Sequence, residues 1–304
     1  MEDLKEVLSY IKSISIKSLD DYLKIKKGLY DNLFSKLPVI VQKIPKGIHV
    51  FRTVKVFRND LTVGRTKYLS YRPSEVKYTK FNRCSEPDQT HFYCSTTKEA
   101  SVFETTFATE NIDEPNPIFS KDEELLEIGM WEVQRDLYVV DFRYGSHSTP
   151  ETVEIKNNLI DTYHSNFKDE TIREIFSFMN SCFQKPIKAN SDIDYWLTAC
   201  CSNYIFDDQY VPKPDVGNLH ELKGMKTVSV DGIIFQSVKG LKTNPQLHGD
   251  NIVLRPSLID TKALKLEKAL ICLTKKIGET EFNLDVPLKI QTKIEGNAWY
   301  YDLV

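Results

Sequence analysis

Long apolar runs and a basic surplus are both missing from this sequence, and its first residues show no pattern of a secretory leader. No stretch reaches the roughly 18 apolar residues that a membrane-spanning helix needs. The chain opens Met-Glu-Asp-Leu-Lys-Glu, with neither a basic nor an apolar leader region, so we expect a soluble, cytoplasmic protein. Lys and Arg total 40 against 43 Asp and Glu, for a net charge of -3. This balance argues against an avid nucleic-acid binder.

Metal-site and cofactor motifs are also missing. None of the six cysteines belongs to a C-x-x-C pair, and no His lies at a zinc-site spacing from them. We therefore expect no metal site, and thiols that are buried or reduced at Cys84, Cys94, Cys182, Cys200, Cys201 and Cys272. Neither a G-x-G-x-x-G fingerprint nor a P-loop occurs, and H-E-x-x-H and G-x-S-x-G are absent as well.

The 304 residues are enough for one large domain or two small ones. The pattern of residues 1–45 predicts an N-terminal helical segment, with one amphipathic helix from Leu4 and a second that is interrupted or kinked near Gly28. Its apolar face requires a partner, which is either the rest of the chain or another subunit. Residues 46–256 form the predicted main domain, with a helical insertion at about 151–190, and residues 257–304 form a C-terminal extension.

The main domain mixes strands and helices without a regular βαβα alternation, which indicates an α+β fold rather than a doubly wound sheet. Thr96 and Glu99 have the spacing of a capping box, so a helix should begin there after a strand that ends near Ser95. Other helices are expected at 151–185 and 192–207, with a loop at 208–225. Further strands are expected at 48–56, 126–133, 137–142, 227–237 and 251–254.

Glu104 is the most informative residue of the helix predicted after Ser95. Ala100, Phe103 and Phe107 form its apolar stripe, and Glu104 falls inside this stripe. A carboxylate on a core-facing surface is costly unless it is paired or borders a cleft. Glu104 is therefore either a site residue, or a partly exposed or ion-paired structural residue.

Three more residues admit a structural and a functional interpretation. Tyr93 is either a packed core residue or a stacking platform for a planar ring. Arg83 is either a solvated loop residue or a phosphate ligand. Ser237 follows the apolar residues 233–235, where its hydroxyl either caps a strand end or binds a ligand.

Together these residues stand in an order that resembles the RES-domain family, named for an Arg, a Glu and a Ser. The resemblance covers about residues 48–256, although Asn82 and Ser85 depart from the Gly and Asn of the family pattern. The matching elements are Phe51-Arg52, Asn82-Arg83-Cys84-Ser85-Glu86-Pro87, Phe92-Tyr93-Cys94-Ser95, Ala100 to Glu104, Trp131-Glu132-Val133 with Leu137 to Asp141 as a hairpin, Asp231 to Ser237, and Gly249-Asp250-Asn251.

The resemblance implies an ADP-ribosyltransferase-like mixed sheet with surrounding helices, and an enzyme that consumes NAD as its substrate without a further cofactor. Such proteins cleave the nicotinamide–ribose bond by hydrolysis, phosphorolysis or ADP-ribosyl transfer, and many are toxins of toxin–antitoxin pairs. The resemblance assigns catalysis to Arg83, Tyr93 and Glu104, and substrate binding to Arg52, Ser85, Ser237 and Asn251.

The resemblance implies NAD and an antitoxin protein as partners, and the N-terminal amphipathic helices suggest a second copy of the chain as a further one. Glu104 would stabilise the positive charge that develops on the ribose, Tyr93 would stack on nicotinamide, and Arg83 would hold the pyrophosphate or a ribose hydroxyl. Two alternatives come from other classes of protein. One is a catalytically quiet module that binds a nucleotide or a partner, and the other is a protein that self-associates through its N-terminal helices.

Overall fold

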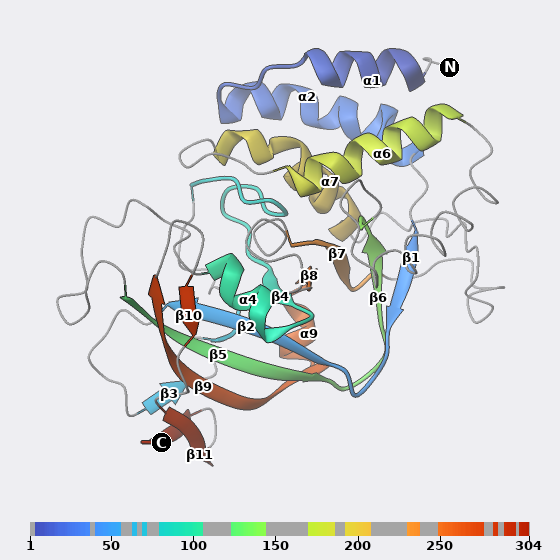
Figure 1. The fold of residues 1–304 in the computed structure, drawn as a ribbon. Coiled ribbons are helices and arrows are strands. Elements are labelled where there is room, and N and C mark those ends of the chain that lie inside the picture. The colour runs from blue at the N-terminus through green and yellow to red at the C-terminus, as the bar shows by residue number, and fades with distance from the viewer. Residues whose placement is uncertain are drawn as a thin grey trace. The chain divides into compact units, whose positions relative to one another are not determined.

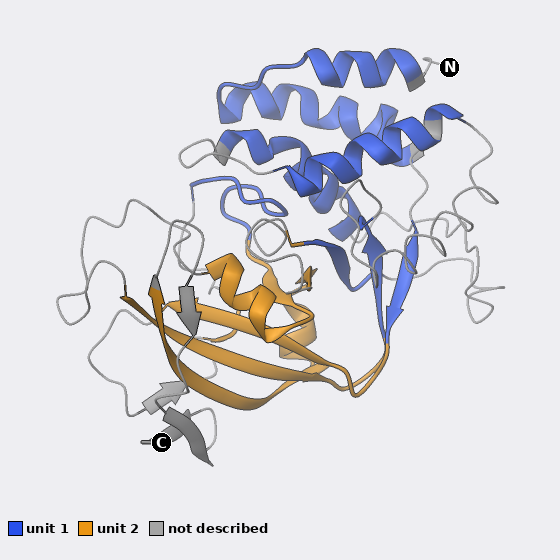
Figure 2. Cartoon of the chain, viewed as in Figure 1, with its two compact units in different colours: residues 1–44, 74–89, 137–236 blue, residues 45–73, 90–136, 237–304 orange. Residues whose placement is uncertain are grey.

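The computed structural model describes residues 4–36, 40–55, 63–65, 69–71, 79–105, 123–143, 170–185, 192–207, 230–237, 249–276, 282–284, 289–295 and 298–303. The chain divides into two compact units, coloured separately in Figure 2. Unit 1 comprises residues 1–44, 74–89 and 137–236, and unit 2 comprises residues 45–73, 90–136 and 237–304. The helices and the mixed strand pairing confirm the α+β class. The division of the chain at residues 45 and 256 stays a prediction.

Unit 1 combines helices with a short sheet (Figure 1). Strand β6 lies between an antiparallel partner, β1, and a parallel partner, β7. The elements are α1 (Leu4–Ser13), α2 (Leu19–Asn32), the 3-10 helix η1 (Phe34–Lys36), β1 (Val41–Ile44), β6 (Leu137–Asp141), α6 (Glu170–Gln184), η2 (Asp192–Tyr195), α7 (Trp196–Phe206) and β7 (Gly232–Gln236).

Apolar side chains of α1 and α2 are buried, and α1 contacts α6 while α2 contacts α7, which favours the rest of the chain as the partner of these helices. Lys12 of α1 pairs with Glu174 of α6 at 3.4 Å. The rings of Tyr30 on α2 and Tyr204 on α7 meet edge to face, with centroids 4.9 Å apart. Helix α2 continues through Gly28, so the predicted interruption is wrong. A helical glycine costs only about 1 kcal/mol, which tertiary packing readily offsets.

Aromatic side chains fill the interior of unit 1 between α6 and the strands. Phe142 stacks on Phe183 at 4.3 Å between centroids and on Phe176 at 5.9 Å, and Phe183 approaches Phe235 at 5.5 Å. Helix α6 accounts for the described part of the helix predicted at 151–185, since residues 151–169 lie outside the described residues. The loop expected at 208–225 lies outside them too.

Unit 2 is built on an antiparallel sheet in the order β8-β4-β2-β5-β9-β11-β12-β3, with β10 also pairing with β9 (Figure 1). Its strands are β2 (His49–Lys55), β3 (Val63–Arg65), β4 (Phe92–Ser95), β5 (Glu123–Val133), β8 (Asp250–Leu254), β9 (Leu264–Lys276), β10 (Phe282–Leu284), β11 (Lys289–Glu295) and β12 (Ala298–Leu303). Its helices are α4 (Lys98–Thr105) and α9 (Ser257–Asp260).

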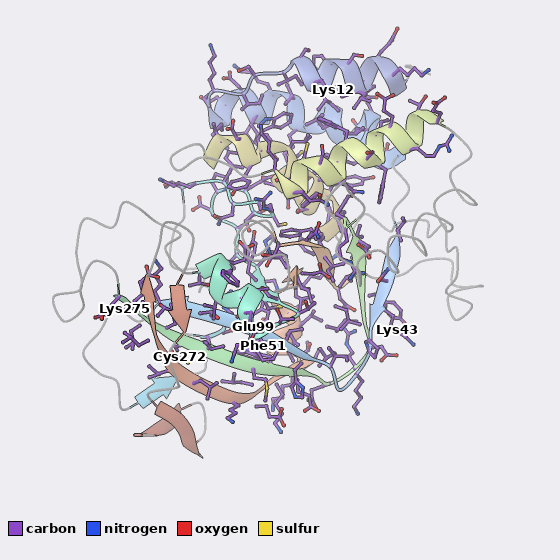
Figure 3. All side chains as sticks on the ribbon, in the orientation of Figure 1. Lys12, Lys43, Phe51, Glu99, Cys272 and Lys275 are labelled. Carbon is purple, nitrogen blue, oxygen red and sulfur yellow. The ribbon has the colours of Figure 1, made fainter. Side chains whose placement is uncertain are left out.

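Helix α4 covers one face of this sheet, over β2 and β5. The labels of Glu99 and Phe51 in Figure 3 mark α4 and β2, respectively. Val102 packs there in a cluster with Leu126, Ile128, Leu270 and Cys272. The buried hydroxyls of Ser101 and Thr53 also hydrogen-bond across this contact, at 2.7 Å. On the opposite face Phe92 meets Trp131 edge to face, with centroids 5.1 Å apart. Apolar packing on both faces holds the strands that present the candidate site.

The strands predicted at 126–133 and 137–142 are confirmed as β5 and β6, but they do not form the hairpin expected between them. Strand β5 pairs with β2 and β9, whereas β6 pairs with β1 and β7. The chain turns after the end of β5, where the side chain of Asp136 accepts a hydrogen bond from the backbone N–H of Lys46 at 2.9 Å.

None of the helices in the described part of the chain has the length and apolar character that a membrane-spanning helix requires.

Candidate functional site

Two neighbouring threonines hold the start of α4, one through a helix-capping hydrogen bond and the other through a hydrogen bond to β8. Thr97 Oγ1 accepts a hydrogen bond from the backbone N–H of Ala100 at 3.2 Å, which makes Thr97 the residue that caps the helix. Thr96 Oγ1 instead accepts from the backbone N–H of Asp250 at 2.8 Å, which ties the helix start to β8. The predicted capping box at Thr96 and Glu99 is therefore wrong by one residue, because β8 already occupies the hydroxyl of Thr96.

Glu104 lies in the last turn of α4 and receives hydrogen bonds from two residues of other segments. The hydroxyl of Ser237 donates to Oε1 of Glu104 at 2.6 Å, and Nδ2 of Asn251 donates to the same oxygen at 3.0 Å. Ser237 is 1% exposed and Asn251 is 8% exposed, whereas Glu104 is partly exposed. The carboxylate is thus held by two buried donors and keeps access to the surface.

A third buried hydroxyl extends this network. Ser95, at the end of β4, donates to Oδ1 of Asn251 at 3.0 Å. Ser95 and Asn251 are direct partners in the antiparallel pairing of β4 with β8. Sequence reasoning did not single out Ser95, because only the register of these two strands places it opposite Asn251. Ser95, Asn251, Glu104 and Ser237 together are called the Glu104 cluster below.

Tyr93 lies on the sheet face that carries the Glu104 cluster. It precedes Ser95 by two residues on β4, and side chains two apart on a strand leave the same face. Tyr93 is paired with Val253, two residues beyond Asn251. The structure therefore brings together four of the seven predicted site residues, namely Tyr93, Glu104, Ser237 and Asn251, on one face of unit 2.

Arg52 occupies the opposite face of the same sheet. Its neighbour Phe51 is paired with Ser95, so Arg52 points away from the Glu104 cluster. Its guanidinium carbon lies 5.4 Å from the centroid of the Phe92 ring, and Nη1 donates to the backbone oxygen of Tyr93 at 2.7 Å. The contact with the Tyr93 backbone assigns Arg52 a part in holding β4, and its predicted role in substrate binding stays a prediction.

Arg83 and Ser85 belong to unit 1, in the loop of residues 82–89. The guanidinium of Arg83 donates to the backbone oxygens of Phe183, at 2.5 Å, and Lys185, at 3.1 Å, near the end of α6. It also lies 5.0 Å from the centroid of the Tyr195 ring. These contacts satisfy carbonyls that the helix end leaves without helical partners. Ser85 is buried, and its backbone pairs with that of Asn82.

The same loop carries a buried carboxylate, Glu86, that sequence reasoning missed. Tyr22 donates a short hydrogen bond to Oε1 of Glu86, and Asn203 of α7 donates to the same oxygen at 2.8 Å. Lys26 forms an ion pair with Oε2, also at 2.8 Å. Burial raises the pKa of Tyr22 far above its ordinary value, so its phenol stays protonated and donates. The i, i+4 spacing of Tyr22 and Lys26 was the one signal available in the sequence.

The cysteines fit the prediction of buried or reduced thiols. All six are free, and all but Cys182 are buried. Burial raises the pKa of Cys182 to about 11 and that of Cys200 to about 12, so both are protonated thiols at neutral pH. Among the described residues, no three His, Cys, Asp or Glu side chains gather as metal ligands would.

Acid is expected to destabilise the fold through His91, which precedes β4. Burial, aided by the positive charge of Arg255, lowers the pKa of His91 from 6.5 to about 4. Between these values the unfolded chain binds a proton that the folded chain does not, so stability falls as the pH drops from about 6.5 to 4. The loss amounts to at most about 3 kcal/mol. Urea unfolding of the wild type and of His91→Gln at pH 7.5, 6 and 5 should show a shallower decline in the variant, and parallel declines would contradict this expectation.

A scan of the chain against descriptions of protein families finds no match, and a search of curated proteins finds none either.

Proposed function

We propose that this chain is an NAD-consuming enzyme that cleaves the nicotinamide–ribose bond with Glu104 as its central catalytic residue. The observation that carries the proposal is the convergence of Glu104 with Ser237 and Asn251, which lie 133 and 147 residues further along the sequence. Tyr93 lies on the same face of the sheet. This set agrees with the resemblance to RES domains, and an ADP-ribosyltransferase-like arrangement of the fold belongs to the same proposal.

The chemistry of the reaction suits a carboxylate held in this way. Breaking the bond between nicotinamide and ribose develops positive charge on the ribose, as in glycoside hydrolysis. A carboxylate fixed by Ser237 and Asn251 can face that charge without reorganising during the reaction. Nicotinamide leaves as a neutral amine, so the step requires no strong general acid. The acceptor is water, phosphate or a protein side chain, which gives hydrolysis, phosphorolysis or ADP-ribosyl transfer.

A purified-protein assay of nicotinamide release from NAD tests this proposal. Replacing Glu104 by Gln should lower release by about 100-fold or more, while NAD binding measured by calorimetry is retained. Glu99 provides a matched control, because it lies in the first turn of the same helix and is exposed beside Lys98. Glu99→Gln should leave release unchanged. Comparing phosphate-free and phosphate-containing buffer separates hydrolysis from phosphorolysis.

Equal release by wild type and Glu104→Gln would overturn the catalytic role of Glu104. One observation favours a second candidate, a module that binds a nucleotide or partner without catalysis. The guanidinium of Arg83 is already bonded to backbone oxygens at the end of α6, although the proposed reaction assigns Arg83 to the pyrophosphate. NAD binding without release, in the presence or absence of phosphate, would favour that candidate.

The proposed biological setting follows from the same resemblance. A toxin or defence effector that depletes NAD would require a protein antitoxin, and self-association of the chain is a further proposal. Co-purification with a separately expressed antitoxin of the family would support the proposal that this chain is a toxin. Sedimentation of the isolated chain would test the proposed self-association, because a monomer at micromolar concentration would exclude a stable oligomer.

A further inference from the structure

The amide of Asn251 is held between a hydroxyl donor and a carboxylate acceptor. Its Oδ1 accepts from Ser95 at 3.0 Å, and its Nδ2 donates to Oε1 of Glu104 at 3.0 Å. An amide can be turned so that its oxygen and nitrogen exchange places. The exchanged orientation would set Oδ1 against the carboxylate oxygen, and the hydroxyl of Ser95 could then no longer donate to the amide oxygen.

We propose that Ser95 is a positioning residue, whose hydroxyl fixes the orientation in which Asn251 donates to Glu104. The proposal rests on the proposed function for its catalytic consequence, but its structural content concerns only unit 2. Ser95 is 2% exposed and Asn251 is 8% exposed, so water competes weakly for either group. In such surroundings successive hydrogen bonds polarise one another, and the donor strength of Nδ2 depends on the bond at Oδ1.

Ser95 acts differently from Ser237, although both are buried serines of the Glu104 cluster. Ser237 donates to Glu104 directly, whereas Ser95 reaches it only through the amide of Asn251. Loss of Ser95 therefore removes no atom that contacts Glu104. Its loss permits the amide to turn, and the carboxylate then loses one of its two described donors for part of the time.

Ser101 provides a matched control within the same unit. It is a buried serine of α4, 4% exposed, and its hydroxyl contacts Thr53 at 2.7 Å and the backbone oxygen of Lys98 at 2.8 Å. Ser101→Ala removes a buried hydroxyl as Ser95→Ala does, but from a hydrogen bond outside the Glu104 cluster. A general loss of stability would affect both variants, whereas a change in the Asn251 amide should follow Ser95 alone.

The primary experiment records the side-chain amide resonances of Asn251 in the nitrogen–proton NMR spectrum of the full chain, assigned through Asn251→Asp. The proton that bonds to Glu104 should lie downfield in the wild type and in Ser101→Ala. It should move upfield in Ser95→Ala, and also in Glu104→Gln. Ser95→Thr, which restores the hydroxyl, should return it toward the wild-type position. An unchanged resonance in Ser95→Ala would overturn the proposal.

The second readout is nicotinamide release. Ser95→Ala should lower kcat on the order of tenfold with little change in KM, because the amide moves and the NAD contacts remain. Ser95→Thr should recover most of the loss, and Ser101→Ala should match the wild type. If Ser95→Ala and Ser101→Ala lose equal activity, the role of Ser95 is merely structural and the proposal fails. A wild type that releases no nicotinamide would remove the proposed function, while the resonance of Asn251 would still decide the role of Ser95.

Discussion

Replacing Glu86 by Leu is expected to lower the free energy of unfolding by about 3 kcal/mol. The substitution leaves the phenol of Tyr22, the amide of Asn203 and the ammonium of Lys26 without the carboxylate that accepts from all of them. Tyr22 is 0% exposed, so water cannot readily replace the lost acceptor. Urea unfolding followed by far-ultraviolet circular dichroism measures the loss.

The matched control is Glu174→Leu, which makes the same substitution at an exposed ion pair of unit 1. Glu174 lies 3.4 Å from Lys12, and both side chains are about half exposed. Such pairs contribute at most about 1 kcal/mol, so the control should remain close to the wild type. Glu86→Gln, which keeps the shape of the side chain and loses its charge, should fall between the two. Equal losses at Glu86 and Glu174 would show that the buried carboxylate does not stabilise unit 1.

Replacing Gly249 by Ala is expected to cost about 3 kcal/mol and to disturb the Glu104 cluster. A Cβ at this position would lie 2.3 Å from Oγ1 of Thr97 and 2.5 Å from Cβ of Ala100. Thr97 caps α4, and Ala100 lies in its first turn, so the helix start must shift to admit the methyl group. Urea unfolding gives the cost, and nicotinamide release reports the displacement of Glu104.

Gly28 offers a control of opposite sign for the Gly249 variant. It lies within α2, and a Cβ there would meet no atom within 4 Å. Gly28→Ala should therefore raise stability by about 0.5–1 kcal/mol, because alanine favours the helix more than glycine does. A Gly249→Ala variant as stable as the wild type would mean that α4 moves freely, and the packing argument would fail.

Local patterns in the sequence predicted several of the elements, although they indicated none of the strands β9 to β12. The periodicity of residues 4–32 predicted α1 and α2, and the capping pattern after Ser95 predicted α4 to within one residue. These features depend on neighbours only a few residues apart. The hairpin of β5 and β6 was wrong because strand pairing depends on partners such as β9, which lie more than 100 residues away.

The candidate site shows the same limit. Glu104 was singled out from helical spacing, and Ser237 and Asn251 from the resemblance to RES domains, but nothing local indicated that they would meet. Arg52 shows that the face of a strand follows from register, since its neighbour Phe51 is the residue paired with Ser95. The donors to Glu86 come from positions 60 or more residues away, so the i, i+4 spacing of Tyr22 and Lys26 indicated a shared helix face but not a contact with Glu86.

The interleaved order of the two units has a consequence for how the chain is made. Unit 1 takes residues from both ends of the stretch 1–236, and unit 2 requires segments as far apart as 45–73 and 237–304. During synthesis the helices α1 and α2 therefore emerge long before β7. Glu104 likewise cannot form its hydrogen bonds with Ser237 and Asn251 until more than 100 further residues have been added. Long-range closure of this kind slows folding. Because each unit consists of three separate segments, neither unit can be completed during synthesis before parts of the other have been made. For the same reason, a single proteolytic cut cannot release either unit intact.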